Sequence, residues 1–176
     1  MADRRPLQSI PFKGFRIMEI VSIEKSELER YSHLLLPYIY EDLIGDGMET
    51  DTEYFGLAAI ENGEAVSALV IQPEATGDLN IVSVYTLPEY RRRGFATELL
   101  GKSLSVARAL FKWEEGETEE LIILKTLYSL PPDILDVYEN FLIKNHFRDF
   151  VLLKEAAPGE EDVWSGSAEI RFFREV

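Results

Sequence analysis

The chain has 176 residues, 46% of them hydrophobic, which is enough for one compact domain with its own core and short for two. Its 18 basic and 32 acidic residues give a formal net charge of -14, which disfavours nucleic acid as a partner because a nucleic-acid reader needs a basic surface. There is no cysteine, so disulfides, thiolate metal sites and a cysteine nucleophile are excluded. The two histidines, His33 and His146, lie far apart in the sequence, and we expect no metal.

The N-terminal residues predict where the domain begins and in which cellular compartment the protein lies. We expect residues 1–14, which carry Pro6, Pro11 and Gly14, to be a flexible lead-in, and residues 15–176 to form a single domain. The first sixteen residues contain no long apolar segment, and no uncharged apolar run approaches the length that crosses a bilayer. The sequence therefore predicts a cytoplasmic protein that does not contact membranes.

The first part of the chain predicts a strand, a helix and an acidic loop. Phe15 to Ile23 suits a strand, and Glu24 to about Ile44 has apolar residues close to helical spacing, with Pro37 expected to break or kink the helix. Six acidic residues with two glycines between Glu41 and Glu53 indicate a loop.

A hairpin and a third strand follow. Tyr54 to Ile60 and Ala65 to Gln72 are apolar, β-rich runs joined through Asn62-Gly63, the strongest short signal for a tight hairpin. After a turn over residues 73–78, Leu79 to Leu87 predicts the next strand.

The second half alternates helices and strands. An apolar face with helical spacing predicts a helix from Phe95 to Phe111, and Pro131-Pro132 introduces a second amphipathic helix. The remaining elements that we expect are a buried strand at Leu121 to Leu127, the helix Asp133 to Asn145, strands at Phe147 to Lys154 and Ala168 to Glu175, and a surface excursion at Glu155 to Gly166. The order predicts an α/β fold with antiparallel hairpins and at least one crossover between parallel strands.

One strand-to-helix junction carries the chemistry. After the strand ending at Leu87 come Pro88-Glu89-Tyr90 and then Arg91-Arg92-Arg93-Gly94-Phe95-Ala96, which opens the long helix. A strand that turns through glycine into a helix N-terminus presents free N–H groups and a positive dipole end, and both favour phosphate. In the nearby sequence only Glu89 and Glu98 neutralise the three arginines. No Gly-Lys-Ser/Thr follows, so the junction is not a P-loop.

These residues resemble the signature of the GNAT acyltransferase superfamily, Gln/Arg-x-x-Gly-x-Gly/Ala, after a strand that ends near Pro-Glu-Tyr. The resemblance extends over roughly residues 15–153. It implies an α/β fold with a mixed, mostly antiparallel central sheet, splayed at two parallel strands and flanked by helices on both faces. It also implies acetyl-CoA as a co-substrate.

The resemblance implies the following binding residues. Coenzyme A pyrophosphate would lie on the loop and helix start, which comprise Arg91, Arg92, Arg93, Gly94, Phe95, Ala96 and Thr97. The pantetheine arm would lie between residues 82–87 and residues 121–125, its amides paired with backbone groups of Val84 and Thr86, where a bulge splays the strand. An N–H group near Val84 would polarise the thioester carbonyl.

The acid and base of the family pattern are not in their usual places. Many members carry a glutamate as the base eleven residues before the signature, where this chain has Asn80. Asp78 or an acid of the 41–53 loop could replace this base through water. Alternatively, an acceptor of low pKa could need no strong base. The usual acid is a tyrosine in Tyr-Glu-Lys-x-Gly-Phe, where this chain has Leu142 and, for the glycine, His146. Tyr138, one helical turn earlier, is the candidate acid and also a candidate core aromatic.

Three functions are open at this level. The first is an N-acetyltransferase that moves an acetyl group from acetyl-CoA to a primary amine of a small molecule or peptide by direct attack on the thioester. The second is a catalytically weak or silent CoA-binding regulatory module, which Asn80 and Leu142 would permit. The third is an interaction module that works through its acidic surface. A homodimer stays open, since pairing through the late strands is common in the family.

Overall fold

The computed structural model describes residues 18–35, 55–74, 78–110, 119–130 and 132–173. The predicted lead-in at residues 1–14 and the acidic loop at residues 41–53 lie outside the described residues. None of the helices in the described ranges is long and apolar enough to span a membrane.

The described elements follow one another in the predicted order. In chain order they are β1 (Glu19–Ile23), the 3-10 helix η1 (Lys25–Leu34), β2 (Phe55–Glu61), β3 (Glu64–Pro73), β4 (Leu79–Thr86), the 3-10 helix η2 (Pro88–Tyr90), α2 (Phe95–Leu110), β5 (Glu119–Tyr128), α3 (Pro132–Lys144), β6 (Arg148–Lys154) and β7 (Val163–Phe173).

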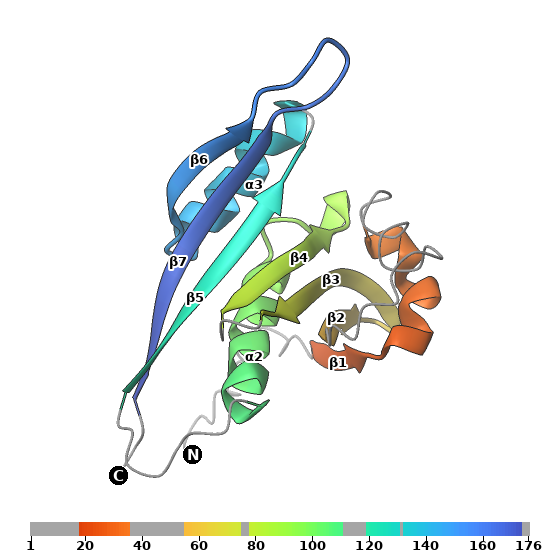
Figure 1. Ribbon diagram of the computed structural model, residues 1–176. Helices are drawn as coiled ribbons and strands as arrows, with labels where there is room; N and C mark the ends of the chain where they lie inside the picture. The colour runs from red at the N-terminus through yellow and green to blue at the C-terminus, as the bar shows by residue number, and fades with distance from the viewer. Residues whose placement is uncertain (1–17, 36–54, 75–77, 111–118, 131, 174–176) are drawn as a thin grey trace, which may run out of the picture.

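The strands form one seven-stranded sheet in the order β1-β2-β3-β4-β5-β7-β6. Every neighbouring pair is antiparallel except β4 and β5, which are parallel and joined by the crossover that contains α2. The sheet is therefore mixed and mostly antiparallel, as the sequence predicted. Figure 1 shows that β4 and β5 lie close at one end and diverge toward their C-terminal ends.

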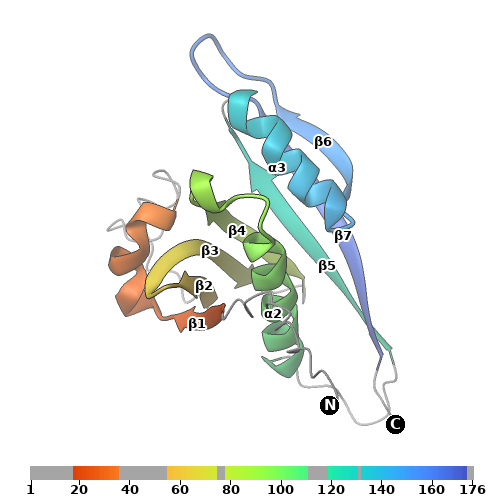
Figure 2. The same ribbon diagram turned by 180° about the vertical axis from the view of Figure 1, so that it is seen from behind.

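Two hydrophobic clusters cover opposite faces of the sheet. The larger one joins Leu99 of α2 and Leu142 of α3 to inward residues of the strands, such as Ile81. The smaller one packs Leu34 of η1 against the other face, on residues such as Val70 of β3. Figures 1 and 2 show α2 and α3 on the same side of the sheet, so helices flank both faces as predicted.

The predicted hairpin between β2 and β3 is confirmed. Asn62 and Gly63 form its two-residue turn with φ angles of 55° and 83°. Positive φ at both central residues defines a type I′ turn, whose twist matches that of the flanking strands. The Asn-Gly pair therefore sets the register of the strand that leads toward the candidate site.

The first helix is shorter than the prediction of Glu24 to about Ile44. η1 is a 3-10 helix that ends at Leu34, after which Leu35 is extended with φ -107° and ψ 140°. Leu34 and Leu35 are both buried in the smaller cluster, so the chain leaves the helix where it meets the sheet. Pro37, the predicted breaking point, lies outside the described residues.

Two of the late strands also differ from the prediction. β5 is not buried on both faces: Ile122, Leu124 and Thr126 are buried, whereas Leu121 and Leu127 are 47% and 55% exposed. Buried and exposed side chains therefore alternate along β5, because α3 covers only one face of this part of the sheet.

The last strand begins at Val163 and not at Ala168, so the predicted excursion at residues 155–166 is shorter. Gly166 is part of this strand. The position favours glycine because a Cβ there would approach Phe150 to 2.9 Å. A glycine that looked like a loop residue is thus a point of close packing within the sheet.

Candidate active site

The site begins at an irregularity in β4. Ile81 pairs with Ile71 of β3 and Ser83 pairs with Val70, which leaves Val82 as an extra residue in β4. This is the bulge that the resemblance implied. The ladder between β4 and β5 ends at the same place, because it contains three pairs and the last joins Ile81 to Thr126. We call the point where the two strands part, after Ile81 and Thr126, the fork.

Beyond the fork, the backbone of β4 is directed by its pairing with β3. The Leu87 N–H donates to the Val66 carbonyl at 3.0 Å. Since antiparallel pairing alternates along a strand, Ser83 and Tyr85 also direct their backbone groups to β3. Val84 and Thr86 therefore direct their N–H and C=O groups toward the opposite edge, where β5 has diverged.

The loop that follows β4 ends on an open helix start. Arg92 and Gly94 have φ angles of 58° and 91°, so two residues of this loop adopt the left-handed backbone conformation. The first bond of α2 runs from the Glu98 N–H to the Gly94 carbonyl at 3.0 Å. The N–H groups of Ala96 and Thr97 in the first turn precede that bond and have no carbonyl one turn earlier in the helix. Such a helix start can accept an anion.

The three arginines of the loop do different things. The Arg91 Nε donates to the Thr86 carbonyl at 3.1 Å, and its guanidinium lies 5.5 Å from the Tyr85 ring centroid. One Arg93 nitrogen donates to both carboxylate oxygens of Glu61 at 2.8 and 2.7 Å.

The expectation that only Glu89 and Glu98 neutralise these arginines is wrong. Glu61 lies on β2, 32 residues before Arg93, and it is 7% exposed. Sequence distance hid this partner because the hairpin of β2 and β3 brings it beside the loop. Arg93 also stacks on Tyr90 and Phe95, with 4.9 and 5.5 Å to their ring centroids, and thus ties the loop to the sheet.

Tyr138 reaches the fork from α3. Its hydroxyl lies 3.0 Å from Thr126 Oγ1, which is fully buried and makes a longer contact of 3.5 Å with the Ile81 carbonyl. If the Thr126 hydroxyl donates to that carbonyl, its oxygen accepts the Tyr138 O–H. Tyr138 also packs on the core, which confirms one of the two roles that the sequence left open; its role as the acid stays a prediction.

A second tyrosine supports the first. The Tyr128 hydroxyl donates to Glu139 at 3.2 Å, and its ring meets that of Tyr138 edge to face at 5.1 Å. Burial, followed by the nearby Glu139 carboxylate, raises the pKa of Tyr128 well above its ordinary value of 10.0. Tyr128 therefore stays protonated and fixes the neighbouring ring.

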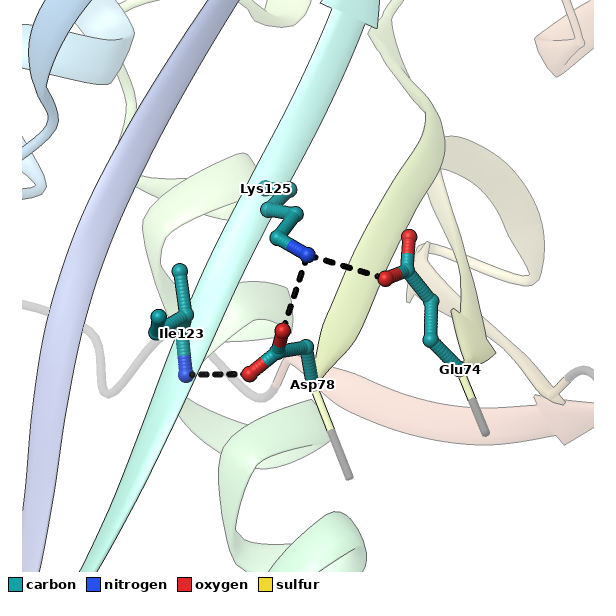
Figure 3. A network of polar contacts seen from close by, with 4 residues as sticks. All are labelled: Glu74, Asp78, Ile123 and Lys125. Carbon is teal, nitrogen blue, oxygen red and sulfur yellow. Dashed lines mark hydrogen bonds and ion pairs between the residues drawn. The ribbon is translucent and has the colours of Figure 1, made fainter. Parts of the chain in front are cut away.

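Asp78 lies at the closed end of the two strands, beside the first pair of the ladder (Figure 3). Its Oδ1 accepts the Ile123 N–H at 3.3 Å, and its Oδ2 lies 2.8 Å from the Lys125 ammonium, which also contacts Glu74 at 3.0 Å. Hydrogen bonds to Asp78 and then Glu74 raise the pKa of Lys125. This network joins the beginning of β4 to β5.

The end of α3 explains both departures from the family pattern. Phe147 N–H donates to the Leu142 carbonyl and His146 N–H to the Ile143 carbonyl, with His146 at φ 68°. This is a Schellman motif, in which the residue at positive φ is usually glycine. Leu142 is fully buried in the larger cluster, so it serves the core.

Sequence reasoning missed several residues that the structure places at the fork. Thr126 looked like an ordinary strand residue, and Ser83 drew no attention. The only local signal was a polar residue on the inward face of an apolar strand, and this face could be assigned only once the bulge was known.

The comparisons with known proteins agree with this geometry. The model described as the acetyltransferase (GNAT) family matches residues 17–121, more than half of the chain, and the chain therefore belongs to this family of acyl-CoA-dependent N-acyltransferases. The match ends before α3, so it does not include Tyr138. No curated protein matches the chain.

Solved structures share the fold at low identity. The ribosomal-protein-S18-alanine N-acetyltransferase of Escherichia coli is 16% identical with a TM-score of 0.58, over 88% of this chain and 94% of that one. A GNAT acetyltransferase of Staphylococcus aureus is 12% identical with a TM-score of 0.62, over 87% and 99%. A Bacillus anthracis protein solved in complex with acetyl coenzyme A is 12% identical with a TM-score of 0.59, over 88% and 100%.

Proposed function

We propose that this acetyltransferase moves the acetyl group of acetyl-CoA to a primary amine of a small molecule or a peptide, by direct attack of the amine on the thioester. One observation carries the proposal. β4 and β5 part after three pairs, and the chain then runs from the end of β4 through the arginine loop into the first turn of α2. A diphosphate on that turn and an extended, amide-bearing arm along β4 would fit this arrangement in one continuous line.

We assign the residues that bind acetyl-CoA from this arrangement of β4 and α2. The pyrophosphate accepts hydrogen bonds from the first-turn N–H groups after Gly94, and Arg91 and Arg92 supply positive charge. Arg93 acts through its backbone and by anchoring the loop to Glu61. The backbone groups of Val84 and the N–H of Thr86 pair with the amides of the pantetheine arm, while the Thr86 carbonyl accepts from Arg91.

The chemistry takes place at the fork. The amine nitrogen attacks the carbonyl carbon and the C–S bond breaks, while the N–H of Val84 stabilises the oxyanion. The Tyr138 phenol gives its proton to the departing thiolate, and the nitrogen loses one proton, which restores the phenol through water. The bond between Tyr138 and Thr126 supports this assignment, because it holds the phenol at the point where the two strands part.

The proton acceptor is a separate question. The prediction that Asp78 takes the proton through water stays a prediction. Both of its carboxylate oxygens are already bonded, one to the Ile123 N–H and one to Lys125, which favours a structural role. The Asp78→Asn variant described in the Discussion separates the two roles.

A catalytically silent CoA-binding module is the second candidate. It is favoured by Asn80, a neutral side chain near the fork, and by Leu142, which is buried where many family members carry a tyrosine. The two candidates agree on CoA binding and differ on turnover.

Two measurements test the proposal. Acetyl-CoA at saturation should raise the melting temperature, because it binds the folded state preferentially. Incubation with a panel of amines and peptides should release coenzyme A thiol, and this can be titrated without protein background because the chain has no cysteine. A melting shift without thiol release above the hydrolysis rate would favour the silent module. An unchanged melting curve would contradict both candidates.

A further inference from the structure

Two buried polar atoms near the fork have no hydrogen-bond partner among the described residues. They are Asn80 Oδ1 and Ser83 Oγ, and they are the two such side-chain atoms found in the part of the chain that the structure describes. Ser83 as a whole is 3% exposed. Leaving a buried polar group unpaired destabilises a protein, so two such groups three residues apart need an explanation.

Both side chains lie on the face of β4 opposite α2. Leu79 and Ile81 belong to the cluster under α2, so Asn80 between them points the other way. Ser83 pairs with Val70, which belongs to the cluster under η1. The bulge at Val82 restores this alignment, because without the extra residue Asn80 and Ser83 would lie on opposite faces.

The two faces of the fork carry different polar groups. The α2 face leads to the open N–H groups of the helix start, which suit a diphosphate. The acceptor must reach the same fork without crossing the path proposed for acetyl-CoA. The opposite face, which carries the two unpaired atoms, is therefore the side for the acceptor. An amide oxygen and a hydroxyl accept hydrogen bonds from N–H groups, but neither takes up a proton at neutral pH.

Within the described residues, the carboxylates that pair with Lys125 do not supply a free base either. Asn80 stands beside Lys125 in the parallel ladder. The ammonium of Lys125 is bonded to Asp78 and Glu74, at 2.8 and 3.0 Å, so both of these carboxylates are ion-paired (Figure 3). An ammonium ion arriving here would meet the Lys125 cation as well.

We propose that Asn80 Oδ1 and Ser83 Oγ hold the N–H groups of the acyl acceptor, and that the acceptor is a weakly basic amine, such as a peptide α-amino group, that arrives neutral. This inference rests on the proposed function and deepens it. The neutral nitrogen donates its two N–H groups to these oxygens and directs its lone pair to the thioester carbonyl. A C–N bond forms, the C–S bond breaks, one proton leaves the nitrogen to water, and the thiolate is protonated.

The acceptor test uses two peptides of one sequence. The first has a free N-terminus and no lysine, and the second has a blocked N-terminus and one lysine. At pH 7 the neutral fraction of an α-amine exceeds that of a lysine amine by a factor on the order of a hundred, and kcat/KM should favour the first peptide to that degree. The rate with the lysine peptide should rise about tenfold per pH unit from 7 to 9, whereas the rate with the first should level near pH 8. Asn80→Asp should raise the lysine rate at pH 7 and flatten its slope.

A second test combines the melting temperature, which does not depend on turnover, with the KM values of the two substrates. Ser83→Ala removes an unpaired buried hydroxyl and should raise the melting temperature by about 2–4 °C, while it raises the KM of the acceptor and leaves the KM of acetyl-CoA unchanged. Ser103→Ala is the matched control, because Ser103 is equally buried but its hydroxyl donates to the Leu100 carbonyl at 2.7 Å. It should lower the melting temperature and leave the acceptor KM unchanged.

The outcomes separate the two levels of the proposal. If Ser83→Ala behaves like Ser103→Ala, or if both peptides react equally with flat pH profiles, the acceptor assignment is overturned while the acetyltransferase stands. If neither peptide nor any other amine releases thiol although acetyl-CoA raises the melting temperature, the enzymatic function itself is overturned, and the acceptor assignment with it.

Discussion

The two ends of β4 differ in how their polar groups are used. At the closed end, Leu79 to Ile81 pair with strands on both sides, and the charge of Lys125 is matched by Asp78 and Glu74. At the open end, β4 pairs with β3 alone beyond the bulge, and the loop that follows contains two residues at positive φ. The backbone of β4 is thus paired on both edges at one end and on one edge at the other.

This contrast shows how a sheet can keep a gap open within a folded domain. Two neighbouring strands whose edges face each other tend to pair along their whole length, because unpaired backbone groups are costly. The bulge at Val82 interrupts the pairing, and the ionic network at Asp78 fixes the strands on the other side of it. The open end is then free to bind a ligand with the groups that a longer ladder would have consumed.

The largest effect is expected from Gly94→Glu at the open end. The position has φ 91°, which costs a side chain about 1–3 kcal/mol, and a carboxylate there repels a diphosphate from the helix start. We expect the acetyl-CoA melting shift to disappear and kcat/KM to fall by about 100-fold or more. Thermal melting with and without ligand, followed by thiol release, measures both.

Gly101→Glu provides the matched control for that variant. Gly101 lies in the same helix, is exposed, and has no neighbouring atom within 4 Å of an added Cβ. The same charge there should leave the ligand shift intact and stabilise the helix by about 0.5–1 kcal/mol. If both glutamates abolish the shift, the diphosphate does not bind at the start of α2.

A smaller effect is expected from Thr126→Val at the fork. Valine keeps the shape of threonine but cannot hold the Tyr138 hydroxyl, which now lies 3.0 Å from Thr126 Oγ1. We expect kcat to fall by about 10–100-fold with the KM of acetyl-CoA unchanged, and Thr126→Ser to restore most of the loss.

The double variant sharpens this test. Tyr138→Phe should reduce kcat similarly, and its combination with Thr126→Val should add little, because both changes remove the same interaction. Steady-state kinetics of the four proteins gives the coupling directly. A wild-type kcat in Tyr138→Phe would show that Tyr138 is a core aromatic without a role in proton transfer.

The same contrast explains what the sequence could predict. The hairpin at Asn62-Gly63, the helix start at Phe95 and the order of the strands follow from local turn chemistry and periodicity, and they are confirmed. The loop of arginines was likewise evident as a motif, because its residues are consecutive.

The remaining features depend on contacts between distant segments. The pairing of Glu61 with Arg93 spans 32 residues, and the meeting of Thr126 with Tyr138 requires the packing of α3 on β5. The face of Ser83 depends on the exact position of the bulge, at Val82, which the resemblance implied only for the strand as a whole. The end of η1 at Leu34 reflects burial against the sheet, which overrides helical spacing.

The smallest effect is expected from Asp78→Asn at the closed end. The amide oxygen can still accept the Ile123 N–H, but the ion pair with Lys125 is lost. Because Lys125 is 39% exposed, we expect the free energy of unfolding to fall by about 1 kcal/mol or less and the melting temperature by about 2–4 °C.

The raised pKa of Lys125 determines how this stabilisation depends on pH. The stabilisation is fully present below the ordinary value of 10.5 and is lost as the pH rises through the higher value of the folded state. The difference between wild type and variant should therefore shrink above about pH 10.5.

Glu160→Gln serves as the control for this variant. It removes another lysine–carboxylate pair, with Lys154, whose side chains are 62% and 53% exposed, so the melting temperature should fall less than in Asp78→Asn. Turnover then decides the role of Asp78. Nearly unchanged kcat in Asp78→Asn, with the lower melting temperature, fits a clamp that holds the strands together below the fork. A kcat reduced by about 100-fold with a wild-type melting curve would instead identify Asp78 as the base, because removing a general base slows proton transfer without removing a stabilising contact.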